Sequence, residues 1–413
     1  MPTNRPRPDR PAADARSSAP STGLSCPHFG ACGGCSRLDQ PIEQQLADKQ
    51  ARAVELCGAW LDGVTPQIAL PPRPPRHDRT AMLYPVQRRG RRILTGIYRR
   101  STHDVEPITD CRIQHRALTE FGLRMADALP RLDVEPYDEA KLSGDLRALR
   151  ARVMPGSGEL LVGAVVTSLR FAARDKLVDA LRRAGSQLKD DQGKALDLVG
   201  VVLNVNAEAG NKLLGAESHA LVGRDHQFDR VTSPQGELSL RVSFGSFYQL
   251  HRRADAVLFR PALELLGDVR GLRIVDGYGG VGTFALRLLR DGAAHVTLIE
   301  SAESSCADAR ANFTNNHFYQ DRAAVREEPF GSRPLPSCDV LVVDPPRAGL
   351  MAAGADAVLA SDAERVLLVS CALESLARDL PLLESRYRVE AMRLCDLFPH
   401  TEHVEAVTLL RRR

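Results

Sequence analysis

The chain lacks several features that would place it in a broad class at once. No apolar run approaches the roughly 18 residues that a membrane-spanning helix requires, and no segment repeats at the period of about 20 to 50 residues typical of solenoids. The formal net charge is only +3, which is too small to indicate nucleic-acid binding by itself. The first two dozen residues contain no apolar stretch like that of a signal peptide. These absences predict a soluble, cytoplasmic protein.

The length and the changes in composition predict three regions. A chain of 413 residues is too long for one core of ordinary size. Residues 1–24 are rich in Pro, Arg and Ser, and we expect them to form a disordered tail. Residues 25–225 are expected to form an α+β domain, in which a helix at about 39–62 has an apolar face that can pack on the C-terminal part. Residues 226–413 are expected to form a second domain, and the protein is expected to be a monomer.

Positive charge is concentrated in residues 73–100, which hold nine arginines, two tyrosines and a single acidic residue, Asp78. Arginine guanidinium groups match the geometry of phosphates and stack on bases. The stretch is therefore a candidate RNA-facing surface. On charge alone, a solvated hairpin face is an equally good interpretation.

The nine cysteines do not all serve the same purpose. In a chain without an export signal they face a reducing compartment, where metal ligation or catalysis is favoured over disulfides. Cys26, Cys32 and Cys35 form a C-x5-C-x2-C pattern that could hold zinc or an iron–sulfur cluster, and either group needs a fourth ligand. Ordinary packing positions are expected for four others: Cys57, Cys306, Cys338 and Cys395.

The C-terminal part alternates short hydrophobic strands with helical patterns. The strand segments are LRIV, HVTLIE, CDVLVV, RVLLVS, YRVEAMRLC and VEAVTLL. Such alternation predicts a Rossmann-like α/β fold with a doubly wound, mostly parallel sheet and right-handed crossovers. The last two segments form a hairpin, which would place an antiparallel strand at or near one edge.

A glycine-rich loop, DGYGGVG, follows the strand at 272–275 and precedes an amphipathic helix, which is the context of a nucleotide-binding loop. Glu300 ends the next strand, where a carboxylate can bind the ribose hydroxyls of an adenosine group. These features suit either a dinucleotide or S-adenosylmethionine. The segment VVDPPRAGL favours S-adenosylmethionine, because its two prolines make a rigid loop that places Asp344 over the cofactor and a target base.

Cys371 follows the strand RVLLVS, and a lone free cysteine is more often a core residue than a catalyst. Here the strand ends at the same sheet edge as the strand that precedes Asp344. The thiol is therefore expected to face the same crevice, where a reaction that needs a thiolate nucleophile could use it. The shared edge favours the catalytic interpretation over the core one.

The ordered segments GSFYQLH, DGYGGVG, DPPRAGL, LVSC and FPHTEHVEAVTLL resemble those of the RNA (uracil-5-)-methyltransferases, which make 5-methyluridine in large-subunit rRNA and in tRNA. The resemblance covers about residues 25–413. It implies a class I S-adenosylmethionine-dependent methyltransferase domain at 226–413, preceded by an iron–sulfur and RNA-recognition domain. No oligonucleotide-binding barrel is expected before the cysteines, so the chain is similar to the shorter members that modify 23S rRNA.

The resemblance also implies residue roles. Cys371 matches the nucleophile that adds to carbon 6 of uracil, and Glu405 matches the base that removes the proton from carbon 5. The positions implied to bind S-adenosylmethionine are Gln249, Tyr278, Gly280, Thr283, Glu300 and Asp344. Phe247, two residues before Gln249, can serve as a core ring or stack on a base.

Many members of this family carry a four-iron cluster on a C-x5-C-x2-C pattern and a later cysteine. Cys111 is therefore the implied fourth ligand beside Cys26, Cys32 and Cys35, and a [4Fe-4S] cluster is favoured over zinc. The cluster is expected to be structural or to support RNA binding, because methyl transfer moves no electrons. The RNA target is expected to be a hairpin loop whose uridine flips into the crevice.

Three sites depart from the family pattern. Gly279 replaces a cysteine of the glycine loop, His251 replaces an asparagine, and Ala372 and Leu373 replace Asn-Pro after the nucleophile. The alternatives are the same chemistry on tRNA, a catalytically silent RNA-binding protein of the same fold, and a dinucleotide oxidoreductase with a zinc module. The oxidoreductase alternative gives no joint role to Cys371, Glu405 and Asp344.

Overall fold

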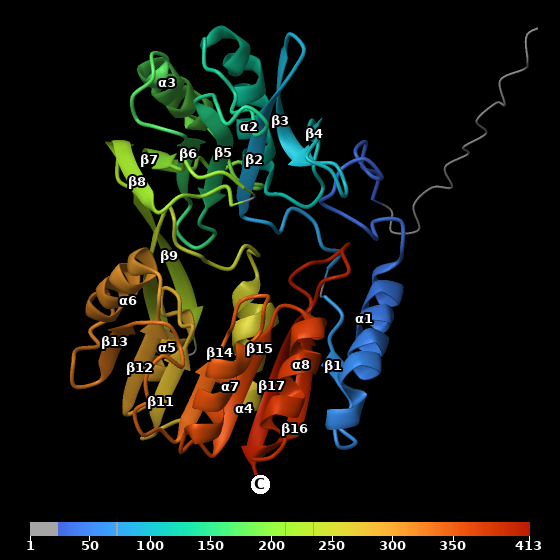
Figure 1. Ribbon diagram of the computed structural model, residues 1–413, viewed down its shortest axis with the longest axis vertical. Coiled ribbons are helices and arrows are strands. Elements are labelled where there is room, and N and C mark those ends of the chain that lie inside the picture. Colours follow the sequence, from blue (N-terminus) through green and yellow to red (C-terminus); the bar gives the residue numbers. More distant parts are fainter. Residues whose placement is uncertain (1–23, 72, 211, 234) are drawn as a thin grey trace, which may run out of the picture.

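The computed structural model describes residues 24–71, 73–210, 212–233 and 235–413. The predicted disordered tail therefore lies outside the described residues, apart from Leu24. Two large sheets stand one above the other, and a two-stranded hairpin lies between them (Figure 1). Within the described part of the chain, none of the helices combines the length and apolarity that crossing a bilayer requires.

The upper sheet belongs to the N-terminal half. Its strands are β2 (Ala81–Arg89), β3 (Arg92–Tyr98), β4 (Val105–Pro107), β5 (Leu146–Val153), β6 (Glu159–Val166), β7 (Asp197–Val205) and β8 (Glu217–Gly223). They follow the order β4-β3-β2-β5-β6-β7-β8, and all pairs are antiparallel except β6 with β7. The helices are α2 (Arg116–Ala128), which continues into a 3-10 turn (Leu129–Arg131), and α3 (Arg174–Gly185). Both helices share one apolar core with the sheet, so this half has a core of its own.

The lower sheet carries the C-terminal half. Its strands are β1 (Gln67–Ile68), β11 (Arg273–Gly277), β12 (His295–Glu300), β13 (Ala323–Glu327), β14 (Val340–Val343), β15 (Arg365–Ser370), β16 (Tyr387–Cys395) and β17 (Glu405–Arg412). The order is β1-β16-β17-β15-β14-β11-β12-β13. Only β17 is antiparallel to its neighbours, and it lies next to β16 near one edge. The predicted mostly parallel sheet with a closing antiparallel hairpin is confirmed.

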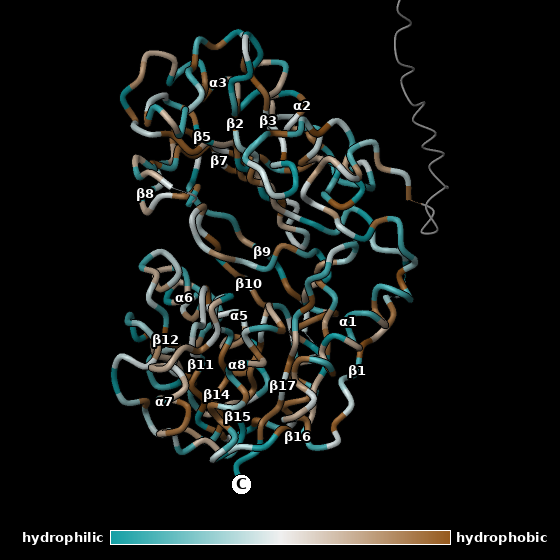
Figure 2. Tube along the Cα trace, turned by 45° about the vertical axis from the view of Figure 1, so that its right-hand side comes forward, coloured by the Kyte–Doolittle hydropathy of each residue, from teal (hydrophilic) through white to brown (hydrophobic). Residues whose placement is uncertain are grey.

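Helices cover both faces of the lower sheet, because its strands are apolar on both sides. One face packs against α4 (Arg260–Leu266), which follows a π-helical turn (Asp255–Phe259), and against α5 (Thr283–Arg290) and α6 (Glu303–Asn315). The other face packs against α1 (Ile42–Cys57), α7 (Met351–Ala360) and α8 (Leu373–Leu383). Hydrophobic residues accordingly run along the central strands (Figure 2). The sheet is therefore held rigid between two helical layers.

The N-terminal segment at 42–68 packs on the lower sheet rather than on the upper one. Helix α1 buries Ala53 and Cys57 against that sheet's second face and continues into a 3-10 turn (Gly58–Trp60). The two-residue strand β1 then pairs in parallel with β16 at the sheet edge. The four cysteines expected to be packing residues, Cys57, Cys306, Cys338 and Cys395, are all buried.

The hairpin of β9 (His226–Ser233) and β10 (Gly236–Ser243) is fastened to α6 by side chains. Asn312 accepts from the Arg241 backbone N–H at 2.5 Å and donates to the Arg241 carbonyl at 3.0 Å. One turn earlier, buried Asp308 accepts from the Ser243 N–H at 2.7 Å and from the Ser246 hydroxyl at 2.7 Å. The free edge of β10 is thus paired by side chains instead of a strand. This fixes the segment that leads to Gln249.

Candidate active site

Polar residues gather at one edge of the lower sheet. Strands β11, β12, β14 and β15 are parallel, so their carboxyl ends meet there. Tyr278, Glu300, Asp344 and Cys371 stand at or just after these four ends. Strand β17 runs the opposite way, so its first residue, Glu405, lies beside the end of β15. Topology therefore brings five of the predicted residues to one place.

A cavity of about 640 Å³ opens over this edge. Seven of the predicted site residues line it: Gln249, Tyr278, Gly280, Glu300, Asp344, Cys371 and Glu405. Thr283 stands at the start of α5 and does not line the cavity. Small-molecule sites are typically about 300–1,000 Å³, so the cavity has room for a nucleoside-sized ligand.

The glycine loop and Glu300 are joined by backbone hydrogen bonds. The Glu300 carboxylate accepts from the N–H of Gly280 at 3.0 Å, and from those of Ser301 and Ala302 at 2.7 Å each. Gly280 has a φ of +54°, and a Cβ there would meet nothing within 4 Å, so the loop is open toward the cavity. At Gly279 a Cβ would come within 2.5 Å of the Leu298 side chain. Gly279 therefore packs closely on β12, and a larger side chain there would require Leu298 to move.

Tyr278 is held in an unusual backbone conformation, with a φ of +58°. Its hydroxyl donates to the Leu350 carbonyl at 3.3 Å. A Cβ added at Gly354 would lie 2.8 Å from that hydroxyl, so only glycine allows the phenol to approach α7 this closely. The Leu350 N–H in turn donates to the buried Asp379 carboxylate at 3.0 Å. Asp379 of α8 therefore anchors the loop that carries Asp344 and supports Tyr278.

Three carboxyl groups lie at the cavity: Asp276 and Glu405 are buried, Asp344 is half-buried, and Asp344 and Glu405 line the cavity. Burial raises the pKa of Asp276 to about 8, and the charges of Asp344 and Glu300 act in the same direction. Burial also raises the pKa of Asp344 and of Glu405, which are close enough for the charge of Asp344 to raise that of Glu405 further. Among the described residues, one oxygen of Asp276 and one of Glu405 have no hydrogen-bond partner. Asp276 and Glu405, each with a pKa of about 8, therefore favour the protonated form at neutral pH, whereas Asp344, with a pKa of about 7, populates both forms there. Each is a stronger base once ionised than an exposed carboxylate.

Cys371 is half-buried and faces the same carboxyl groups. Burial raises the pKa of its thiol to about 11, the charges of Glu405 and Asp344 raise it further, and Arg347 opposes them. The free protein therefore keeps a neutral thiol at pH 7. A nucleophilic role requires that its proton leave as the sulfur attacks.

The sequence did not predict several residues that line the cavity. Phe398 and Arg347 line it from loops after β16 and β14, and Asp78, Arg79 and Ile113 line it from the N-terminal half. The positive charge of residues 73–100 indicated a role for Arg79 in RNA binding. It did not indicate that Arg79 lies beside the C-terminal sheet. The cavity is therefore built by both halves of the chain.

The cavity is also lined by one aromatic ring, Phe247, and one imidazole ring, His251. Phe247 lines the cavity with 65% of its surface exposed, so it is not a core ring. His251 lines it while remaining buried, and burial lowers its pKa to about 4. The histidine that replaces the family asparagine is therefore neutral at pH 7.

A family model of tRNA (Uracil-5-)-methyltransferase matches residues 336–413. An uncharacterized RNA methyltransferase of Bacillus cereus is 30% identical, over 98% of this chain and 85% of its own length. Another, of Leptospira interrogans serovar copenhageni, is 29% identical, over 95% of this chain and 100% of its own length. The crystal structure of Pyrococcus abyssi tRNA (uracil-54, C5)-methyltransferase with S-adenosyl-L-homocysteine shares the fold, with a TM-score of 0.73 and 23% identity over 94% of this chain and 86% of that one.

The chain belongs to the RNA uracil-5 methyltransferase family. It is an S-adenosylmethionine-dependent RNA methyltransferase, and the predicted Rossmann-like class I fold is confirmed. The dinucleotide oxidoreductase alternative is therefore wrong. The methyltransferase has its cavity at the carboxyl ends of the strands, where open α/β sheets bind their ligands.

The four N-terminal cysteines of the methyltransferase line one small pocket: Cys26, Cys32, Cys35 and Cys111. Burial raises the pKa of the Cys35 thiol to about 12, and the charges of the other three raise it further. Backbone N–H groups donate to two of the sulfurs, from Gly34 to Cys32 at 3.3 Å and from Gln114 to Cys111 at 3.5 Å. No group of three His, Cys, Asp or Glu side chains within the described ranges is arranged to hold a metal ion.

The arginine-rich stretch divides into two parts in the methyltransferase. Its second part forms the exposed turn between β2 and β3, where Arg88 makes a two-bond ion pair with Glu135 and Arg89 lies 3.1 Å from Asp104. Its first part precedes β2 and reaches the cavity through Arg79. Only the first part is therefore next to the candidate active site.

Proposed function

We propose that the enzyme methylates carbon 5 of a uridine in 23S rRNA through a covalent adduct with Cys371. The observation that carries the proposal is the shared cavity, which is lined by a thiol, a buried carboxyl group and the residues proposed to bind the cofactor. S-Adenosylmethionine supplies the methyl group when bound. Gln249, Tyr278, Gly280, Glu300 and Asp344 are the proposed cofactor contacts, and Thr283 is proposed to act from the start of α5.

Cys371 opens the reaction in this proposal. Carbon 5 of uracil is a poor nucleophile, and addition of the sulfur to carbon 6 turns the ring into an enolate that can take the methyl group. The thiol proton must leave at this step, because the pKa of Cys371 is raised to about 11. Ionised Asp344 is the neighbouring group proposed to accept it, because burial raises the pKa of Asp344 to about 7 and Glu405 must stay unprotonated for the later step.

Glu405 completes the reaction. After methyl transfer carbon 5 carries both the methyl group and a proton. Glu405 removes that proton, the carbon–sulfur bond breaks, and the thiolate leaves. The raised pKa makes the ionised carboxylate a better base than an exposed glutamate, and its unpartnered buried oxygen supports a role toward a group in the cavity.

Cys26, Cys32, Cys35 and Cys111 are proposed to hold a [4Fe-4S] cluster. In such a cluster each cysteine binds a different iron, so the four sulfurs stand farther apart than around one zinc ion. Four thiols that line one pocket support this assignment. Its role is structural or in RNA binding, because the reaction moves no electrons.

The domain roles follow from this proposal. Residues 25–225 recognise RNA and carry the cluster, whereas residues 226–413 bind the cofactor and catalyse methyl transfer. The enzyme is proposed to act as a monomer in the cytoplasm.

The second candidate substrate is tRNA. It is favoured by the description of the matched family and by the tRNA enzyme that shares the fold.

Mapping 5-methyluridine in rRNA and tRNA, with and without this protein, tests the proposal. Loss at one 23S rRNA uridine is the expected result. Loss in tRNA alone would establish the second candidate. Unchanged methylation in both RNAs would favour a catalytically silent RNA-binding protein of this fold.

A further inference from the structure

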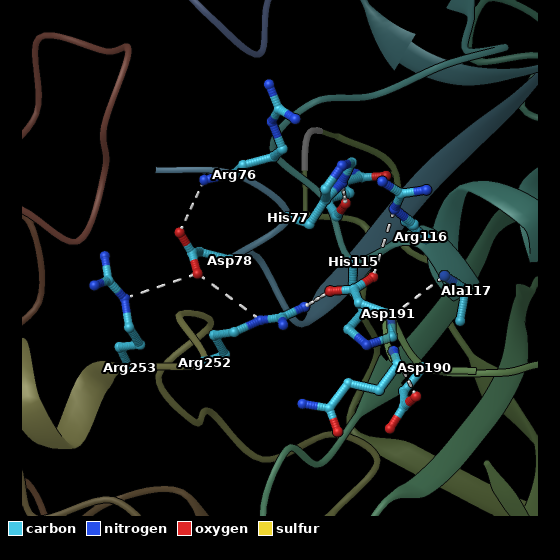
Figure 3. A network of polar contacts seen from close by, with 12 residues as sticks. Arg76, His77, Asp78, His115, Arg116, Ala117, Asp190, Asp191, Arg252 and Arg253 are labelled. Carbon is cyan, nitrogen blue, oxygen red and sulfur yellow. Dashed lines mark hydrogen bonds and ion pairs between the residues drawn. The ribbon is translucent and has the colours of Figure 1, made fainter. Parts of the chain in front are cut away.

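Six arginines from three separate parts of the chain meet beside the catalytic cavity. They are Arg73, Arg76, Arg79, Arg116, Arg252 and Arg253. Figure 3 shows several of them converging on two aspartates, Asp78 from the N-terminal half and Asp191 from the loop after α3. The cluster therefore joins the upper sheet to the segment that follows Gln249.

Asp78 is the centre of this cluster and is only 2% exposed. Its carboxylate accepts from the Arg73 guanidinium at 2.6 Å and from the Arg76 backbone N–H at 3.1 Å. The Nε atoms of Arg252 and Arg253 each lie 3.8 Å from it. Both Nε atoms are buried and find no hydrogen-bond partner in the described residues. The single carboxylate of Asp78 therefore lies close to several guanidinium groups but does not accept a hydrogen bond from each of them.

The acidic residues nearby do not balance the arginines. Asp191 accepts from Arg252 at 2.5 Å and lies 3.9 Å from Arg116. The Asp190 carboxylate accepts from the backbone of its own turn, at Gln192 and Lys194. The guanidinium groups of Arg73, Arg116, Arg252 and Arg253 therefore share two carboxylates, Asp78 and Asp191, and those of Arg76 and Arg79 add further positive charge beside them.

The neighbouring histidines add no positive charge to this cluster at neutral pH. Burial lowers the pKa of His77, of His115 and of His251, the last to about 4. All three are therefore uncharged near pH 7. The positive potential is carried by arginines alone and persists across the physiological pH range.

The cluster borders the cavity directly. Asp78, Arg79 and His251 line the cavity wall. The Arg252 N–H donates to the Asp78 carbonyl at 2.8 Å, and the Thr80 N–H donates to the Leu250 carbonyl at 2.7 Å, so the two segments are paired along that wall. A base can enter such a cavity, but its phosphates remain charged and outside.

We propose that this arginine cluster binds the phosphates of the RNA strand adjoining the flipped uridine. The inference rests on the proposed function, since it requires an RNA nucleotide in the cavity. The guanidinium group of Arg76 points away from Asp78 (Figure 3) and is exposed, so it is free to contact a phosphate. Arg253 uses its Nε toward Asp78, which leaves its two terminal nitrogens to form a two-bond contact with a phosphate.

The test compares Arg76→Gln and the double variant Arg76→Gln/Arg253→Gln with the parent protein. A labelled oligouridylate of about twelve nucleotides is the probe, and its affinity is measured over a range of salt concentrations. Each lost phosphate contact should lower the salt slope by about 0.7 for a single strand, and the double variant should bind about tenfold more weakly. The affinity for S-adenosylhomocysteine should stay unchanged.

A matched control removes two exposed arginines far from the cavity, Arg270→Gln/Arg388→Gln, and should keep the parent affinity. Parental affinity and salt slope in both cavity-side variants would overturn the inference. Arg76→Gln alone keeps the test decisive if the double variant fails to fold, because the Arg76 side chain is exposed. Methyl transfer by the parent to RNA lacking the modification is measured separately, so absence of that activity would reject the proposed function without rejecting the phosphate site.

Discussion

At the scale of single residues, the site depends on acids and a thiol that are kept away from water. Asp276 illustrates this most clearly, because it is 1% exposed and burial raises its pKa to about 8. Aspartate in an unfolded chain titrates near 4. Folding therefore favours the protonated form of Asp276 in the ligand-free protein.

Asp276 should make the free energy of unfolding decrease with pH. The stabilising contribution of protonated Asp276 to the free energy of unfolding is fully present below the unfolded pKa of about 4. It is lost as the pH rises through the folded pKa of about 8. Each such group contributes at most about 1.4 kcal/mol per pH unit in that window. Asp276→Asn should flatten the decrease between pH 5 and pH 8, as measured by urea unfolding of the ligand-free protein.

Asp339→Asn is the matched control for this measurement. The pKa of Asp339 is lowered, chiefly by a hydrogen bond from the Arg273 backbone, so its stabilising contribution is lost only as the pH falls below its ordinary value. The control should leave the slope between pH 5 and pH 8 unchanged. Identical slopes for Asp276→Asn and the parent protein would contradict the assignment of a protonated, buried Asp276.

At the scale of elements, a short chain of hydrogen bonds ties α8 to the cofactor side of the cavity. Asp379 accepts from the Leu350 N–H at 3.0 Å, and the Leu350 carbonyl accepts from Tyr278 at 3.3 Å. Helix α8 follows Cys371, so the same helix anchors the nucleophile's strand end and the loop of Asp344. Asp379 is a positioning residue in this account.

Replacing Asp379 should therefore weaken cofactor binding. Asp379→Ala leaves a buried N–H unpaired, at a cost of about 1–3 kcal/mol, and should lower the affinity for S-adenosylhomocysteine roughly tenfold in calorimetric titration. Asp379→Asn keeps an acceptor oxygen and should retain most of that affinity. Asp356→Ala, on the exposed face of α7, is the control, and equal affinities in all four proteins would contradict the positioning role.

The turn between β2 and β3 gives another prediction at this scale. Replacing Arg88, Arg89, Arg91 and Arg92 together should weaken RNA binding and flatten its salt dependence, because phosphate contacts release counterions. The affinity for S-adenosylmethionine should not change. Unchanged RNA affinity would make this turn a solvated surface, with two of its arginines already paired to Glu135 and Asp104.

The strands of the lower sheet were predictable from the sequence because they are buried on both faces and form nearly continuous apolar runs. Shared strand ends then placed Asp344 and Cys371 at one edge. The two-residue strand β1 was not predictable, since such a short element has no periodic signal. The same holds for Asp78 and Arg252, whose contact joins segments more than 150 positions apart and follows only from the tertiary fold.

At the scale of the whole molecule, the two halves meet at the cavity. The segment at 77–80 pairs on one side with the segment that follows Cys111 and on the other with the segment that follows Gln249. Arg79 and Ile113 line both the four-cysteine pocket and the catalytic cavity. The proposed cluster would therefore stabilise a wall of the active site.

Protein purified without oxygen should accordingly be brown and contain about four irons, the complement of a four-iron cubane. Cys111→Ser should lower the iron content, whereas Cys306→Ser, at a buried packing position, should not. Iron analysis and the visible absorption spectrum provide the measurement. A colourless protein that holds one zinc would contradict the cluster.

The covalent adduct tests the central claim most directly. Glu405→Gln should still join Cys371 to RNA and transfer the methyl group, but it should fail to release the product. The variant should accumulate a denaturation-resistant protein–RNA band whose RNA carries the methyl group, while Cys371→Ala and the double variant should give neither band nor product. Normal turnover by Cys371→Ala would show that the thiol is a packing residue and would contradict the mechanism.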